Sequence, residues 1–213
     1  FDHDDAKIDL NNKFDFLHTN GTDGSISFWI KGDTSLLTGD NTVMDQIRRN
    51  SGNKGFQITC DANMRFQYYN PSASGAVNSD SQDISDGKWH HVVLTVDFSN
   101  NQQRFYIDGV ANTQYTRTSS TTVTATDNLV LGHPSGSATD NEFRGGIKQL
   151  LIYDDVLTQS EVTTLYNSGS VLASASVSTS NLQAHYPLET NSTNSKSGGT
   201  NGNDSNMSYE SSE

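Results

Sequence analysis

The sequence has a single cysteine, few basic residues and no long apolar run, and each shortage excludes a class of structure or partner. Cys60 cannot form an intrachain disulfide, and its place at the end of a predicted strand favours a buried, inert thiol. No stretch approaches the roughly 20 apolar residues of a membrane-spanning helix, so we expect no membrane insertion. The sequence has only 13 basic residues and 25 acidic ones, and the net charge of −12 disfavours nucleic acid and anionic lipid as partners. The chain also begins at Phe1 without a signal peptide, which predicts a mature or excised fragment.

Glutamate is scarce among the acidic residues, most of which are Asp. Aspartate favours turns and supplies oxygen ligands to metal-binding loops, so this bias is typical of a loop-rich β protein. The length of 213 residues suits one all-β domain and is sufficient for a sizeable buried core.

Residues 87–108, GKWHHVVLTVDFSNNQQRFYID, predict two strands joined by a polar loop. Val92, Leu94 and Val96 recur with the period of two that is typical of a half-buried strand. The Ser- and Asn-rich stretch that follows favours a turn, and the apolar alternation then resumes. Because a hairpin alone is only marginally stable, more strands must lie beside it.

Further strands are predicted on both sides of this hairpin. They are expected at residues 26–30, 43–49, 55–60, 63–69 and 128–133. Residues 71–86 and 134–141 are rich in turn formers and predict loops. The Thr- and Ser-rich stretch 112–127 favours an edge strand or an extended surface segment.

One short helix is predicted near residues 158–168. Thr158 and Glu161 have the spacing of a capping box, in which each side chain bonds the backbone N–H of the other residue. Gly169 provides the expected C-terminal stop. The predicted fold class is therefore all-β with a single helix docked on the sheets, since so short a helix cannot stand alone.

Three segments in order carry a family resemblance. The W-H-H-V and Y-I-D-G elements of residues 87–109, the segment GSISFWIK at 24–31 and the segment FRGGIKQLLIYDDVLTQSEVTTLYNSG at 143–169 resemble laminin-G-like domains of the concanavalin A-like lectin/glucanase superfamily. The resemblance implies a two-sheet antiparallel jelly-roll sandwich. It says much less about the ligand, because one fold hosts many functions.

The order of the segments departs from that family. FDHDDAKIDL at residues 1–10 resembles the family's second core strand, whereas LQAHYPLE at 182–189 resembles its first. We therefore expect a jelly roll lacking its first strand over 1–170, a linker over 171–180 and a first-strand segment over 181–213. That segment completes its own sheet, completes the sheet of a neighbour or the next repeat, or is a loose tail. The residues expected to mediate strand completion or exchange are Leu182, Ala184, Tyr186 and Leu188.

The resemblance also implies a structural Ca²⁺ ion, the only cofactor expected. Carboxylate and amide oxygens on loops suit that ion. The candidate ligands are Asp2, Asp4, Asp5, Asp140, Asn141 and Glu142. However, Lys148 and Gln149 stand where the family often has Asp-Glu, and a lysine there repels or replaces a cation. The alternative is a solvated acidic loop.

Exposed aromatic rings beside amides are typical of glycan-binding surfaces. The candidate ligand-binding residues are Tyr68, Tyr69, Asn70, Tyr106 and Tyr115. Trp29 and Trp89 occupy motif positions and are expected in the core. His90 and His91 are adjacent, so they point to opposite faces of a strand and cannot share a ligand. Their match to the family motif implies that both are structural.

Glycoside hydrolysis is disfavoured, since it requires two carboxylates across the cleaved bond and the E-x-D-x-E strand of glucanases with this fold is missing. We therefore predict a non-enzymatic module, located outside the cell, on a cell surface or on a virion, that binds a glycan or a surface protein. The first alternative is a self-assembling fibre or virion subunit that exchanges residues 181–190 with a neighbour. The second, least favoured, is a hydrolase.

Overall fold

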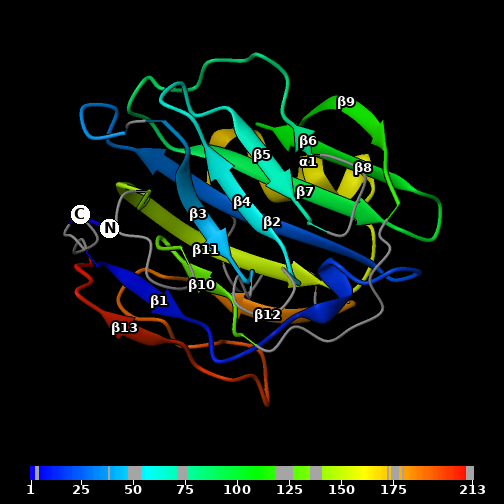
Figure 1. Ribbon diagram of the computed structural model, residues 1–213. Coiled ribbons are helices and arrows are strands. Elements are labelled where there is room, and N and C mark those ends of the chain that lie inside the picture. Colours follow the sequence, from blue (N-terminus) through cyan, green and yellow to red (C-terminus); the bar gives the residue numbers. More distant parts are fainter. Residues whose placement is uncertain are drawn as a thin grey trace.

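Two antiparallel sheets packed face to face make up this chain, as a computed structural model shows (Figure 1). It describes residues 1–2, 5–37, 39–47, 54–71, 76–118, 127–134, 141–171, 173, 178 and 180–209. Sheet A has, in spatial order, β13 (Asn203–Ser205), β1 (Lys7–Asp9), β10 (Val130–Leu131), β3 (Asn41–Asp45), β4 (Gln57–Cys60), β5 (Phe66–Tyr69) and β6 (Val77–Asn78). Sheet B has β12 (Leu182–Tyr186), β11 (Gly145–Tyr153), β2 (Asp23–Gly32), β7 (His90–Asp97), β8 (Gln102–Ile107) and β9 (Val110–Thr116). The predicted jelly-roll sandwich is confirmed.

The hairpin predicted from the alternating residues lies in sheet B between β2 and β9. Strand β7 pairs with β8 so that Val92 lies opposite Ile107 and Leu94 opposite Phe105. All four side chains are buried in the space between the sheets. Strand β9 extends the hairpin and includes the first part of the stretch expected to be extended, whereas residues 119–126 lie outside the described residues.

Aromatic side chains join the two sheets through the core. Phe66 of β5 lies between Phe28 of β2 and Phe105 of β8, with ring centroids 6.2 and 6.1 Å away. Such edge and tilted contacts add to the free energy gained by burying the rings. Cys60 is buried beside them as an unpaired thiol, as expected, and its burial raises the pKa of the thiol.

The single α-helix, α1 (Gln159–Tyr166), covers the outer face of sheet B. The Thr158 hydroxyl accepts a hydrogen bond from the Glu161 N–H, and the Glu161 carboxylate accepts one from the Thr158 N–H, so the predicted capping box is confirmed. Val162 and Leu165 pack on Val93 and other side chains of sheet B. The helix ends at Asn167, whose left-handed conformation takes the place of the stop expected at Gly169.

Two short 3₁₀-helices, Asp15–Leu17 and Asn167–Gly169, complete the elements found in the described residues. The sequence prediction missed strand β6, which lies within residues 71–86 that were expected to be loop, and it assigned no strand at β13 and no 3₁₀-helix at Asp15–Leu17. Strand β6 is only two residues long and pairs with β5, so it is too short for a periodic pattern to predict it.

The C-terminal segment adds one strand to each sheet of its own chain. Strand β12 pairs with β11, and β13 pairs with β1 at the edge of sheet A. Ala184, Tyr186 and Leu188 are buried in the main core, whereas Leu182 packs in the smaller cluster beneath α1. The loose-tail alternative is therefore wrong for the described residues 180–209. Most of the linker expected over 171–180 lies outside the described residues. Whether the C-terminal segment corresponds to the first strand of the family stays a prediction.

Candidate functional site

The residues predicted to contact a glycan do not lie on one surface. The prediction that Tyr68 contacts a ligand is wrong, because its ring is buried and its hydroxyl donates to the Leu17 carbonyl at 2.8 Å. Burial also raises the pKa of Tyr68. The prediction for Asn70 is wrong for the same reason, since its buried side-chain amide donates to the His18 carbonyl at 3.1 Å.

Tyr106 and Tyr115 belong to other parts of the molecule. The Tyr106 ring is buried in the cluster beneath α1, so the prediction that it is an exposed ligand-binding ring is wrong. Tyr115 is half-buried against the main core, with the Arg117 guanidinium carbon 5.3 Å from its ring centroid. Neither ring shares a face with Tyr69.

Tyr69 alone among these residues is an exposed ring on an open sheet face. It is 40% exposed and follows Gln67 on the outward side of β5. Across the sheet, Gln67 lies opposite Thr59 and Asn78, and Tyr69 lies opposite Gln57. We call this surface the β4–β6 face, made up of the outward side chains Gln57, Thr59, Gln67, Tyr69 and Asn78. It combines one aromatic ring with amides and a hydroxyl.

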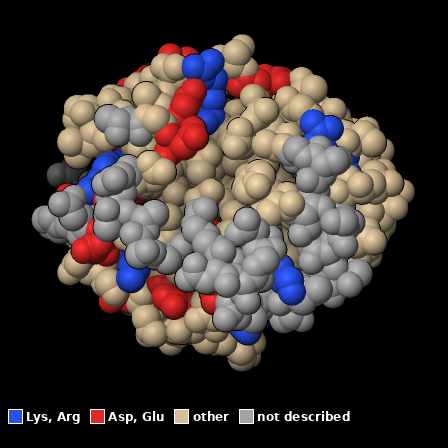
Figure 2. Space-filling view, viewed as in Figure 1, with Lys and Arg blue, Asp and Glu red and all other residues tan. Residues whose placement is uncertain are grey.

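A shallow cleft of about 360 Å³ opens at one end of the β4–β6 face. It is lined by Asp40, Thr59, Asp61, Arg65, Phe66, Gln67, Asn78, Ser79 and Ser81. Asp61 and Arg65 form an ion pair of 2.9 Å that fixes the β4–β5 turn. Figure 2 shows the side of the molecule on which β3, β4 and β5 lie, with a central hollow lined mainly by uncharged side chains.

The predicted calcium ligands are only partly brought together. Asp5 and Glu142 approach each other, and His133, which the sequence prediction missed, lies between them. Asn141 uses its carbonyl to accept from the Thr42 N–H, and Asp2 is not part of this cluster of potential metal ligands. Asp4 and Asp140 lie outside the described residues. The sequence contains only a weak signal for His133 as a metal ligand, since it is one isolated histidine after β10.

These described donors do not fit a calcium site. Ca²⁺ takes about six to eight oxygen ligands, whereas this cluster offers two carboxylates and one imidazole nitrogen. The Arg144 guanidinium also lies 3.1 Å from Glu142 and already supplies a positive charge there.

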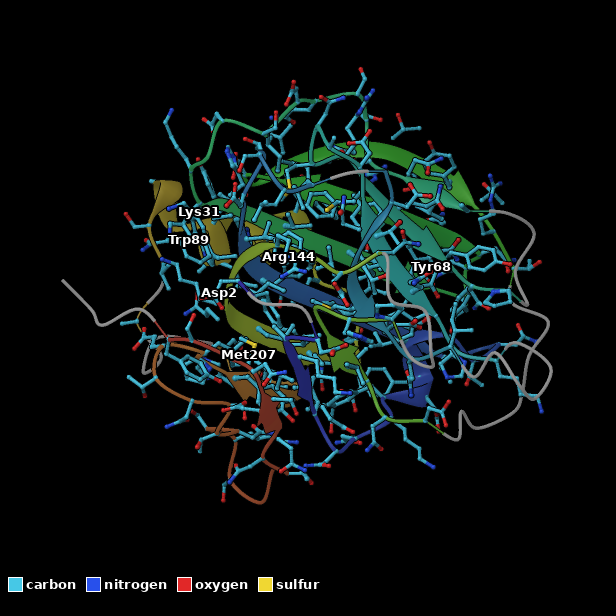
Figure 3. All side chains as sticks on the ribbon, turned by 60° about the vertical axis from the view of Figure 1, so that its left-hand side comes forward. Asp2, Lys31, Tyr68, Trp89, Arg144 and Met207 are labelled. Carbon is cyan, nitrogen blue, oxygen red and sulfur yellow. The ribbon has the colours of Figure 1, made fainter. Side chains whose placement is uncertain are left out.

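Lys148, one of the two residues that depart from the family pattern, packs on an aromatic ring. Its ammonium nitrogen lies 4.1 Å from the centroid of the Trp89 ring, a cation–π contact. Trp89 was expected in the core but is half-buried on the outer face of sheet B, against Gly146 and near Lys31 (Figure 3). Trp29 is buried as expected.

The two adjacent histidines have structural partners, as predicted. The Nδ1 and Nε2 atoms of His90 lie 2.7 Å from Asp108 and 2.9 Å from Asp86. Burial opposes the protonation of His90, but the two carboxylates outweigh it and raise the pKa of His90. His91 faces the other way, and its Nε2 lies 2.8 Å from the Ser27 hydroxyl.

The described glutamates show no arrangement of the kind that glycoside hydrolysis requires. Glu142 pairs with Arg144, Glu161 belongs to the helix cap, and Glu189 is exposed after β12. Among the described residues there is thus no positive evidence of catalysis.

A family model described as the concanavalin A-like lectin/glucanases superfamily, of laminin G type, matches residues 2–163. The chain belongs to this superfamily. The match agrees with the two sheets and the single helix, and it leaves β12 and β13 outside the matched region. No curated protein matches the sequence.

Solved structures with the same fold are distant in sequence. A protein of Bacteroides ovatus, described as a candidate carbohydrate-binding protein, is 14% identical, with a TM-score of 0.64 over 93% of this chain. This chain spans only 55% of the length of that protein. The CBM40 of the Ruminococcus gnavus IT-sialidase is 15% identical, with a TM-score of 0.61, over 78% of this chain and 94% of that one. The SAP-like pentraxin of Limulus polyphemus is 13% identical, with a TM-score of 0.55, over 76% of each chain.

In the described part of the chain, the one α-helix is too short and too polar to cross a membrane.

Proposed function

We propose that this chain is a non-catalytic glycan-binding module and that the β4–β6 face is its contact surface. The exposed Tyr69 ring beside Gln67 and Gln57 is the observation that carries the proposal. An aromatic ring packs against the apolar face of a pyranose, while neighbouring amides exchange hydrogen bonds with its hydroxyl groups. The similar structures support the same class of ligand, since the IT-sialidase CBM40 is also known bound to α2,3-sialyllactose.

Charge favours an uncharged sugar over a sialylated one. The cleft contains Asp40 and Asp61 against Arg65 alone, and Arg65 is already paired with Asp61. The whole chain carries a net charge of −12, which repels an anionic ligand. We therefore infer that this chain prefers neutral oligosaccharides, unlike the sialyllactose-bound module.

An extracellular or surface location is part of this proposal, because glycans are presented there. Exchange of β12 between copies has less support, since β12 pairs with β11 of its own chain. A surface protein as partner has no observation that favours it over a glycan.

The Tyr69→Ala variant tests the proposed face. On an array of neutral and sialylated glycans, we expect the full chain to bind neutral oligosaccharides. For the best of these, calorimetry should show about tenfold weaker binding by the variant, which corresponds to roughly 1.4 kcal/mol. Val110→Ala is the matched control, because Val110 is 63% exposed on β9 of the other sheet. Unchanged binding by Tyr69→Ala, or weaker binding by the control alone, would place the ligand elsewhere.

A further inference from the structure

We propose that Asp5, His133 and Glu142 form a binding site for a transition-metal dication of the Zn²⁺ class. Their ligating atoms all lie within 4.8 Å of one another. They come from the loop before β1, the loop after β10 and the residue shortly before β11, so the fold brings together segments distant in sequence. This site shares no residue with the β4–β6 face, and its proposal does not depend on the proposed glycan binding.

The spacing suits ligands around an ion better than it suits hydrogen bonds. Nε2 of His133 lies 3.5 Å from Oδ1 of Asp5 and 3.5 Å from Oε1 of Glu142. A charge-assisted N–H···O bond is about 2.7–2.9 Å long, so both distances are too large for one. Two ligands about 2.0–2.1 Å from a tetrahedral zinc ion are about 3.3 Å apart, close to the two distances from His133 Nε2 to Asp5 and Glu142.

The orientation of the imidazole is fixed for ligation. Nδ1 of His133 lies 2.7 Å from the Pro134 carbonyl, which can only accept, so Nδ1 carries a proton. In the neutral ring, Nε2 then has its lone pair directed at the two carboxylates. The side chain is only 9% exposed, and a carbonyl partner on the second ring nitrogen is typical of metal-ligating histidines.

Glu142 is held in an equally defined way. Its side chain is 8% exposed, and Oε2 accepts a hydrogen bond from Arg144 at 3.1 Å. That bond leaves Oε1 to face His133. With a neutral imidazole, two carboxylates and one guanidinium, these groups sum to one negative charge. In the neutral ring a lone pair facing two carboxylates is repulsive, and a dication between them, like a proton on Nε2, removes the repulsion.

The donor set selects the class of metal. Imidazole nitrogen with carboxylate oxygen suits zinc and its neighbours, whereas Ca²⁺ and Mg²⁺ prefer oxygen ligands alone. Asp5 is 68% exposed, so an ion can enter from solvent on its side, and water can occupy a further position.

Calorimetry tests the proposal. The full chain is first stripped of metal with a chelator and is then titrated with ZnCl₂, CaCl₂ and MgCl₂ in turn. We expect one Zn²⁺ per chain, bound at least tenfold more tightly than Ca²⁺. Asp5→Asn should weaken Zn²⁺ binding at least tenfold and leave the fold intact, because Asp5 is exposed and asparagine tolerates its φ of 62°. Asp83→Asn is the control, since Asp83 is an exposed loop carboxylate bonded only to Ser85 among the contacts described.

A second measurement identifies the nitrogen ligand directly. The ¹⁵N resonance of His133 Nε2 should shift on addition of Zn²⁺, while that of His90 should not. No Zn²⁺ binding, an equal affinity in Asp5→Asn, or an unmoved His133 resonance would overturn the site. Tighter binding of Ca²⁺ than of Zn²⁺ would also overturn it, because it would show an oxygen-only site.

Discussion

Two consecutive histidines of β7 show how the period of a strand sets the chemistry of single residues. His90 lies between the carboxylates of Asp86 and Asp108, which raise its pKa. His91 points to the opposite face, where it is buried beside Ser27 and the Trp29 ring. Burial lowers the pKa of His91 to about 4. Neighbouring residues of one type thus favour opposite charge states.

Acid should destabilise the chain through His91. In the unfolded chain a histidine has a pKa of about 6.5, so the folded state binds fewer protons than the unfolded state as the pH falls from about 6.5 to about 4. Stability from His91 is therefore complete above about pH 6.5 and is lost toward about pH 4, by about 3 kcal/mol in total. His90 acts with the opposite sign, since its raised pKa stabilises the fold below about pH 6.5.

Urea unfolding across this pH range isolates the His91 contribution. The His91→Gln variant keeps a hydrogen-bonding side chain but cannot be protonated, so the free energy of unfolding should depend less on pH than in the wild type. His90→Gln is the control and should change the pH dependence in the other direction. Parallel pH profiles for His91→Gln and the wild type would contradict the assignment.

Tyr68 and Tyr69 show where prediction from single residues fails. The alternation of β5 predicts that one ring faces inward and one outward, but both rings were proposed as ligand contacts. Phe66, two residues before Tyr68, packs on Phe28 and so places Tyr68 inside and Tyr69 outside. His133 was missed for a related reason, because only the folded chain shows which loops meet.

At the scale of elements, local signals predicted best where they are chemically specific. The capping box placed α1 because it requires defined side chains three residues apart, and the alternating apolar residues placed β7 and β8. Strand β6 had no such signal. It depends on pairing with the short strand β5, which the sequence does not encode locally.

The cap of α1 should make a measurable contribution to stability. Thr158→Ala removes the hydroxyl that accepts from the Glu161 N–H, and we expect a loss of about 1 kcal/mol in the free energy of unfolding. Thr164→Ala is the control, because Thr164 is exposed in the same helix and bonds only the Ser160 carbonyl in the described contacts. Equal losses in the two variants would mean that the cap adds nothing specific.

For the whole molecule, the C-terminal segment links both sheets. The Tyr186 hydroxyl, at the end of β12, donates to the Thr200 carbonyl at 2.8 Å and lies 3.3 Å from the Leu10 carbonyl. Strand β13 then pairs with β1 so that Ser205 lies opposite Lys7. In this antiparallel pair the end of β13 lies beside the start of β1, as in a hairpin. The end of β13 and the start of β1 are thus placed like the two ends of a hairpin turn.

This geometry predicts that a circular permutant will fold. We expect a chain opened after Ala173, with Glu213 joined to Phe1 through a short Gly-Ser linker, to unfold cooperatively, because both β12 and β13 keep their pairing partners. The chain ending at Ala173 is the comparison. It exposes the β11 edge and removes buried Ala184 and Tyr186, so we expect it to aggregate or to lose cooperative unfolding. Denaturant unfolding and light scattering distinguish the two. If the shortened chain were a stable monomer and the permutant failed to fold, the C-terminal strands would be additions to a sandwich that is complete without them.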